Sequence, residues 1–215
     1  MTEVSIQDEI DHIQMCKPHV VILGAGASCA AFPKGDRRSR QLPLMDNIIK
    51  VLDLDNLLAG SNIEFQSDNF EVVYDRLYRD RRFNILRDQL EARVYHYFRQ
   101  LEIPRVPTMY DYLLLSLRSK DVVATFNWDP FLVQAYRRNA QQFPMPLLLF
   151  LHGNVEVGCC LADKVVGSNG AKCPRCDIPM LPTKLLYPVA DKPYHSDPFL
   201  SSQWRQIKDH LKKES

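Results

Sequence analysis

Three short apolar runs, each followed at once by glycine or polar residues, limit the folds open to this 215-residue chain. The runs are HVVILGAG from residue 19, DVVATFNWD from residue 121 and LLLFLHGN from residue 147. Such runs of β-branched and large apolar residues are typical of strands buried in a parallel sheet. Helical patterns lie between them, and this alternation predicts an α/β fold with a parallel sheet flanked by helices.

The helical patterns can be placed along the chain. They cover ASCAAF after the first glycines, LMDNIIKVLDL (residues 44–54), residues 69–100, TMYDYLLLSLRS and PFLVQAYRRN. Residues 69–100 predict one or two amphipathic helices, whose many arginines we interpret as a solvated face. LLYPV (residues 185–189) predicts a further strand, and DPFLSSQWRQIKDHLKKES predicts a last helix that runs to residue 215.

Residues suited to ligand binding follow each of the three apolar runs. In parallel sheets, ligands bind beyond the carboxyl ends of the strands, so we expect these residues to meet there. The glycines allow close approach of a phosphate to the start of a helix. An Asn and an Asp can orient a ligand, and a His can act as a base near neutral pH. The candidates are Gly24, Ala25, Gly26, Ala27 and Ser28, then Asn127 and Asp129, then His152.

Each of these loops also has a simpler interpretation. The glycine pair can form a strand-to-helix turn without a ligand, because two glycines alone are a weak signal. Asn127 and Asp129 can cap the helix that follows, with Asp129 directly before Pro130 at its start. His152 can be a structural histidine. The residues by themselves leave these alternatives open.

A cysteine-rich segment, residues 156–180, interrupts the α/β pattern and predicts a small zinc-ribbon-like insert within a single domain of residues 1–215. Cys173-Pro174-Arg175-Cys176 is a tight turn that suits tetrahedral zinc. The other ligands of such a zinc ion would come from the adjacent pair Cys159 and Cys160. Two thiolates from neighbouring residues bind one ion with difficulty. Zinc held by three or four cysteines is the prediction, and a disulfide or free thiols are the alternatives.

Charge and hydropathy exclude several classes of protein. The formal net charge is +1, which gives no electrostatic case for binding nucleic acid or an anionic membrane. No apolar run approaches the roughly 20 residues of a membrane span. Residues 1–14 carry acidic side chains and no apolar core of a signal peptide, so we expect a cytoplasmic protein.

Taken in order, GAGAS with a following FP, TFNWD, LHG and the cysteine turn resemble the sirtuin-like NAD-binding domain. The resemblance covers residues 18–204 and implies a Rossmann-like sheet. The protein deacylases of that family have Gln where this chain has Phe126, and a Gly-Ile-Pro-x-Phe-Arg run of which this chain keeps Pro33. The chain is more similar to the branch that hydrolyses NAD, many of whose members act in bacterial anti-phage defence. NFEVVYDRL, with Glu71, also resembles a segment of that branch.

The resemblance implies a role for each motif. NAD would be the substrate, with its pyrophosphate on Gly24 to Ser28 and Pro33 beside it. Asn127 would position a ribose hydroxyl or water, Asp129 would hold the carboxamide and His152 would be the base. It also implies homo-oligomers or a partner defence protein, and structural zinc on Cys159, Cys160, Cys173 and Cys176. In that branch one more strand normally follows the last helix, and we expect this chain to lack it, as a fragment or an incomplete domain would. A protein deacylase and a non-catalytic nucleotide-binding module remain as alternatives.

Overall fold

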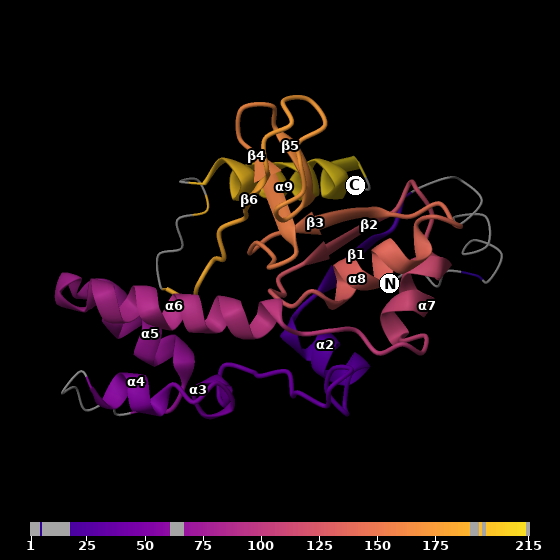
Figure 1. The fold of residues 1–215 in the computed structure, drawn as a ribbon. Coiled ribbons are helices and arrows are strands. Elements are labelled where there is room, and N and C mark those ends of the chain that lie inside the picture. The colour runs from indigo at the N-terminus through magenta and orange to yellow at the C-terminus, as the bar shows by residue number, and fades with distance from the viewer. Residues whose placement is uncertain (1–4, 6–17, 61–66, 190–193, 195–196, 214–215) are drawn as a thin grey trace.

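A parallel sheet forms the centre of this mixed α/β protein (Figure 1). The computed structural model describes residues 18–60, 67–189 and 197–213, together with Ser5 and Tyr194. Within that part, β1 (Val20–Leu23), β2 (Val122–Thr125) and β3 (Leu147–Phe150) are hydrogen-bonded in the order β1-β2-β3. The three strands are parallel, so the predicted parallel sheet is confirmed.

The register of the sheet makes the three strands end level with one another. β2 lies in the middle, and all four of its residues are buried, as its apolar sequence predicted. Leu23 is paired with Thr125, and Thr125 is paired with Phe150. These are the last residues of their strands. The loops that follow therefore leave the sheet at one edge, where ligands bind in parallel sheets.

Helices account for most of the remaining regular structure. Apart from the short 3₁₀ helix η1 (Arg81–Phe83), they are α2 (Ala25–Ala31), α3 (Ile48–Val51), α4 (Asp55–Ala59), α5 (Phe70–Arg79), α6 (Asn84–Arg99), α7 (Met109–Ser116), α8 (Phe131–Asn139) and α9 (Pro198–Lys213). None of these helices has the length and apolar character of a membrane span within the described residues. The predicted end of α9, at residues 214–215, and the acidic segment 1–14 lie outside those residues.

The charged region 69–100 folds as two helices, α5 and α6, as the helical spacing allowed. Each turns an apolar stripe to the main core and its charges to solvent. Figure 1 shows α3 to α6 grouped beyond the carboxyl ends of the parallel strands. The buried residues of the two stripes are Phe70, Val73, Tyr74 and Leu77 on α5, and Leu90, Val94 and Phe98 on α6.

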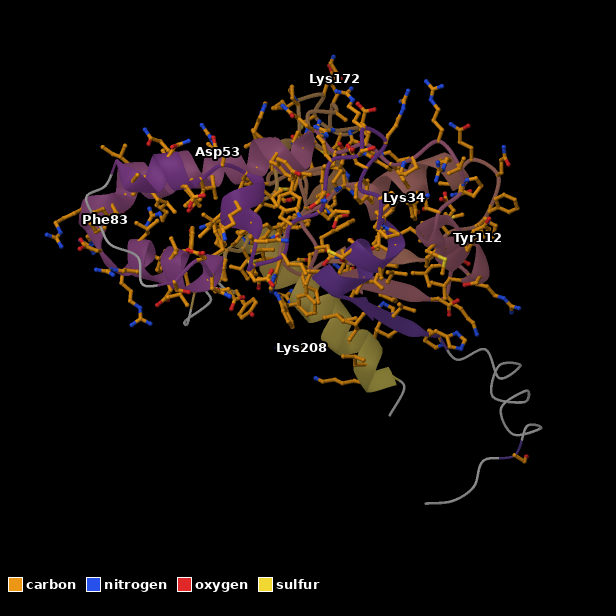
Figure 2. The ribbon with its side chains drawn as sticks, turned by 90° about the horizontal axis from the view of Figure 1, so that it is seen from below. Lys34, Asp53, Phe83, Tyr112, Lys172 and Lys208 are labelled. Atoms are coloured by element: carbon orange, nitrogen blue, oxygen red, sulfur yellow. The ribbon has the colours of Figure 1, made fainter. Side chains whose placement is uncertain are left out.

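The helix predicted over residues 44–54 is present only in part. Only Ile48–Val51 is α-helical there, and a second short helix, α4, starts at Asp55. Asp53, which is labelled in Figure 2, has a φ of 52°, in the left-handed region. The backbone N–H of Leu54 then donates to the carbonyl of Ile49 at 2.9 Å, across the end of α3. A left-handed residue with such a bond is a common way to end a helix.

A second, smaller sheet occupies the cysteine-rich region. β4 (Val157–Cys160) pairs with β5 (Val165–Ser168) and β6 (Leu181–Pro182), in the order β5-β4-β6, and both pairings are antiparallel. The predicted strand at residues 185–189 is absent from the described structure. That run is apolar because it is buried, and Pro188 within it has no N–H to give to a sheet.

Candidate functional site

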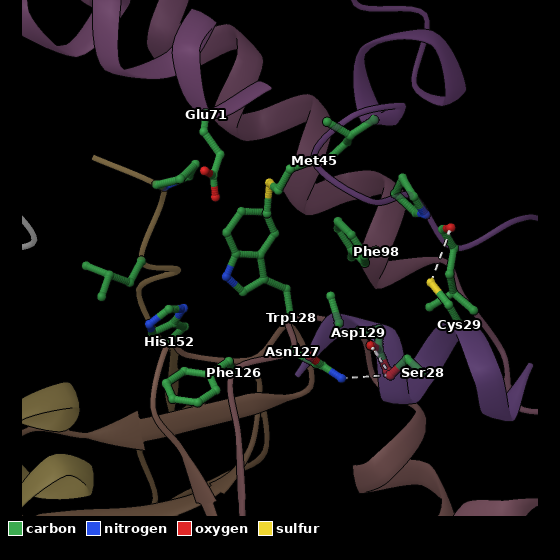
Figure 3. Close-up of a pocket in the computed structure, with 16 residues that line it drawn as sticks. Ser28, Cys29, Met45, Glu71, Phe98, Phe126, Asn127, Trp128, Asp129 and His152 are labelled. Carbon is green, nitrogen blue, oxygen red and sulfur yellow. Dashed lines mark hydrogen bonds between the residues drawn. The ribbon is translucent and has the colours of Figure 1, made fainter. Parts of the chain in front are cut away.

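A pocket of about 230 Å³ lies where the loops after the parallel strands face the group of helices α3, α5 and α6 (Figure 3). Five predicted site residues line it, and Glu71, from the first turn of α5, does so too. The predicted ones are Ala25, Ser28, Asn127, Asp129 and His152. Much of the remaining wall is apolar, including Met45, Ile48, Phe98, Phe126 and Trp128.

Ser28 is the centre of a hydrogen-bonded cluster at one end of this pocket. Its side chain is buried, and its Oγ lies 2.7 Å from Asp129 Oδ2. Asn127 Nδ2 lies 2.8 Å from the same oxygen, and the hydroxyl of Tyr110 lies 2.6 Å from it. A hydroxyl donates once and accepts twice. Ser28 therefore donates to Asp129 and accepts from the other two, which uses its full hydrogen-bonding capacity.

Asp129 is a buried carboxylate with both oxygens engaged. Oδ2 accepts from Ser28, and Oδ1 accepts from the backbone N–H of Phe131 at 3.2 Å, at the start of α8. Burial raises the pKa of Asp129 to about 6, although these hydrogen bonds favour the charged form. The helix-capping interpretation and the site interpretation thus describe the same side chain. Asp129 loses its charge just below neutral pH.

Asn127 links the first two loops. Its Nδ2 donates to the carbonyl of Gly24 at 3.0 Å and to Ser28 Oγ at 2.8 Å. Both amide hydrogens are therefore used, and the orientation of the amide is fixed. Its Oδ1 makes no hydrogen bond within the described residues, so it is available to a ligand hydroxyl or a water in the pocket.

Asn154, which the sequence analysis did not single out, holds the loop that carries Asn127 and Asp129. It is buried, and its Nδ2 donates to the carbonyl of Asn127 at 3.2 Å and to that of Asp129 at 2.7 Å. The preceding Gly153 has a φ of 75°, and a Cβ there would lie 2.1 Å from the carbonyl oxygen of Lys184. The His-Gly-Asn turn thus requires its glycine for a structural reason.

His152 lies on the other side of the pocket from Ser28, with Trp128 between them in the view of Figure 3. Its ring packs edge-on against Phe126, with 4.8 Å between the ring centroids. Its backbone carbonyl accepts from Leu186 N at 2.9 Å, which ties the loop after β3 to the run before α9. A candidate base therefore faces the pocket from the third strand end.

The other predicted ligand-binding residues lie outside this pocket. Gly24 and Gly26 are exposed at the start of α2, and a Cβ on either would meet no atom within 4 Å. Ala27 packs against the core instead. Pro33 lies in an exposed turn after α2, so the structure does not bring it to the pocket with the others.

A candidate metal site lies in the small sheet. One ligand atom each from Cys160, Asp163, Cys173 and Cys176 lies within 4.8 Å of all the others, so these residues can hold a metal ion. Cys160 Sγ and Cys176 Sγ are 3.7 Å apart, and thiolates on a tetrahedral zinc are roughly 3.8 Å apart. A hydrogen bond to Asp163 raises the pKa of Cys176 to about 12. Metal binding must displace that proton.

Cys159 is not part of this cluster, which corrects the predicted set of four cysteines. Consecutive side chains of a strand point to opposite faces, so Cys159 and Cys160 of β4 diverge. Cys159 is buried in an apolar cluster with Phe199 and Leu200 of α9. Asp163 supplies the fourth ligand atom instead. Asp163 could not be predicted from the spacing of the cysteines, because a single aspartate in a loop carries no metal-binding pattern of its own.

Comparisons with known proteins add no family to this geometry. No family model matches the chain, and no curated protein matches it.

Proposed function

We propose that this chain binds NAD⁺ and hydrolyses the bond between nicotinamide and ribose. One observation carries the proposal: Ser28, Asn127 and Asp129, from two different strand ends, share hydrogen bonds beside a pocket that His152 also lines. The order of the motifs resembles NAD-hydrolysing sirtuin-like domains, and this convergence is what such a resemblance requires. We also propose that the three parallel strands are the core of a Rossmann-like sheet.

The size of the pocket fits one half of the dinucleotide. Its volume of about 230 Å³ is below the roughly 300–1,000 Å³ of pockets that enclose drug-sized ligands. Nicotinamide and its ribose would occupy it, and the pyrophosphate would lie over Gly24 and Gly26. Packing does not require a glycine at either position, since a Cβ there would meet no atom within 4 Å. Open space in front of their backbone suits a phosphate.

Cleavage of the nicotinamide–ribose bond passes through an oxocarbenium-like centre, as in glycoside hydrolysis. Nicotinamide leaves as a neutral molecule, so the protein needs no acid to protonate it. Asn127 Oδ1 would orient a ribose hydroxyl or the attacking water, and His152 would accept the proton. The carboxylate of Asp129 would place negative charge near the developing positive charge and, through Ser28, would keep Asn127 in position.

We further propose that the metal in the small sheet is zinc and that its role is structural. Three thiolates and one carboxylate match the ligands and the coordination number of closed zinc sites. The cluster belongs to the β4–β5 turn and the cysteine turn, and none of its residues lines the pocket. Zinc would therefore stabilise the small sheet and would take no part in the chemistry.

Two substitutions test the proposed catalytic residues. We expect Asn127→Ala and His152→Ala each to lower the rate of nicotinamide release from NAD⁺ by roughly 10²–10⁴-fold. Chromatography of the products measures this. Asn56→Ala and His96→Ala, both exposed and outside the pocket, are the matched controls and should retain the wild-type rate. Wild-type rates in both site variants would disprove the assignment.

A further inference from the structure

Trp128 has a buried polar group without a partner. Its side chain is 6% exposed, and its Nε1 has no hydrogen-bond acceptor within the described residues. The indole packs edge-on against Phe98, with 5.8 Å between the ring centroids, and against Tyr187 at 4.9 Å. These contacts fix the direction of the N–H. Figure 3 shows the indole nitrogen facing the side of the pocket where Glu71 and His152 lie.

An unpaired buried N–H destabilises a fold, because the group has lost its water and gained no acceptor. Phenylalanine would offer similar aromatic packing at this position without that cost. A pocket-lining indole with an unpaired N–H is therefore explained if a bound ligand supplies the acceptor. The acceptor must be a compact group, since the space beside Trp128 is part of a pocket of about 230 Å³.

Glu71 supplies the complementary group. It stands in the first turn of α5, lines the same pocket and points into it on the side that the indole nitrogen faces (Figure 3). An ionised carboxylate only accepts hydrogen bonds, and an indole only donates. A primary carboxamide carries one acceptor oxygen and an NH₂ donor, so it can satisfy both at once. Asp129 is less suited to this task, because both of its oxygens already accept hydrogen bonds.

We propose that Trp128 and Glu71 recognise the carboxamide of the nicotinamide ring and so select the amide over the corresponding acid. The indole N–H donates to the carboxamide oxygen, and the Glu71 carboxylate accepts from its NH₂. Nicotinic acid adenine dinucleotide presents a carboxylate instead, which offers no donor and is repelled by Glu71. The inference rests on the proposed function. It assigns recognition of the carboxamide to Trp128 and Glu71, whereas the resemblance implies Asp129.

Calorimetric titration in the cold, where turnover is slow, tests the proposal with NAD⁺ and nicotinic acid adenine dinucleotide. Wild-type protein should prefer NAD⁺ by roughly tenfold or more. Glu71→Gln should reduce the ratio of the two affinities, because a glutamine NH₂ can donate a hydrogen bond to the carboxylate of nicotinic acid adenine dinucleotide. Trp128→Phe should weaken NAD⁺ binding roughly three- to tenfold while its melting temperature stays at or above that of the wild type.

Trp204→Phe is the matched control, because the indole of Trp204 already donates to the carbonyl of Leu151 at 3.0 Å and lies outside the pocket. It should leave NAD⁺ affinity unchanged. Equal affinity of the wild type for both dinucleotides, or wild-type NAD⁺ affinity in Trp128→Phe, would overturn the inference and leave the proposed function in place. Failure of the wild type to bind either dinucleotide would overturn both.

Discussion

At the scale of single residues, the candidate site depends on the shared hydroxyl of Ser28. Ser28, Asn127 and Asp129 could be predicted, because each follows an apolar strand and has chemistry suited to a ligand. Tyr110 could not, since it comes from α7, 82 positions away from Ser28 in the sequence, and no spacing indicates the contact. Asn154 likewise acts through the backbone of another loop, which no local pattern reveals.

Asp129 makes the stability of the protein depend on pH in an unusual direction. Its pKa of about 6 lies above the ordinary 3.8, so between these values the folded protein binds the proton more strongly than the unfolded chain. The free energy of unfolding therefore falls as the pH rises from about 4 to 6. Asp129→Asn removes this contribution. Relative to the wild type, the variant should gain about 2–3 kcal/mol across this window, measured by urea denaturation at several pH values.

Asp36→Asn is a control, because the pKa of Asp36 is lowered in the folded protein, whereas that of Asp129 is raised. Burial tends to raise the pKa of Asp36, but hydrogen bonds from the backbone of Arg40, Glu102 and Arg38 lower it below its ordinary value. Its contribution to stability is complete above pH 4 and is lost only as the pH falls further. The stability difference between Asp36→Asn and the wild type should thus be constant from pH 4 to 7. If the stability difference between Asp129→Asn and the wild type were also constant from pH 4 to 7, the pKa of Asp129 would not be raised in the folded protein.

At the scale of elements, apolar runs predicted the three parallel strands, and helical spacing predicted α5 and α6, but no pattern predicted the strands of the small sheet. The patterns also failed where one residue decides the outcome. Asp53 adopts a left-handed conformation and ends α3. Pro188 has no N–H for sheet hydrogen bonding, and the apolar run 185–189 is not a strand. In β4 the alternation of the strand explains why Cys160 joins the metal cluster while the adjacent Cys159 does not.

The two neighbouring cysteines of β4 give a test of the metal site. Cys160→Ser removes a ligand, so it should lower zinc affinity and the melting temperature, and a chelator should have less further effect on it. Cys159→Ser should bind zinc with the stoichiometry of the wild type. Zinc content after dialysis, together with thermal melting with and without chelator, measures both.

Asp163→Asn extends the test of the metal site to the fourth ligand, because an amide is a weaker zinc ligand than a carboxylate. We expect an affinity between that of the wild type and that of Cys160→Ser. Loss of zinc in Cys159→Ser with retention in Cys160→Ser would show that the opposite face of β4 binds the metal.

At the scale of the whole molecule, the pocket lies between two parts of the fold that are far apart in the sequence. One wall comes from the loops after β1, β2 and β3, and the other from α3, α5 and α6. The wall formed by the loops could be predicted, because ligands bind beyond the carboxyl ends of the strands in parallel sheets. The second wall depends on how the helix group packs against the sheet edge, and no local pattern contains that information.

Incubation of the purified wild-type protein with NAD⁺ alone, followed by chromatography of the products, tests whether the chain is an NAD⁺ hydrolase. We expect nicotinamide and ADP-ribose to appear in equal amounts without any acylated peptide. Binding of NAD⁺ without release of nicotinamide, or release only when an acylated peptide is present, would contradict that expectation.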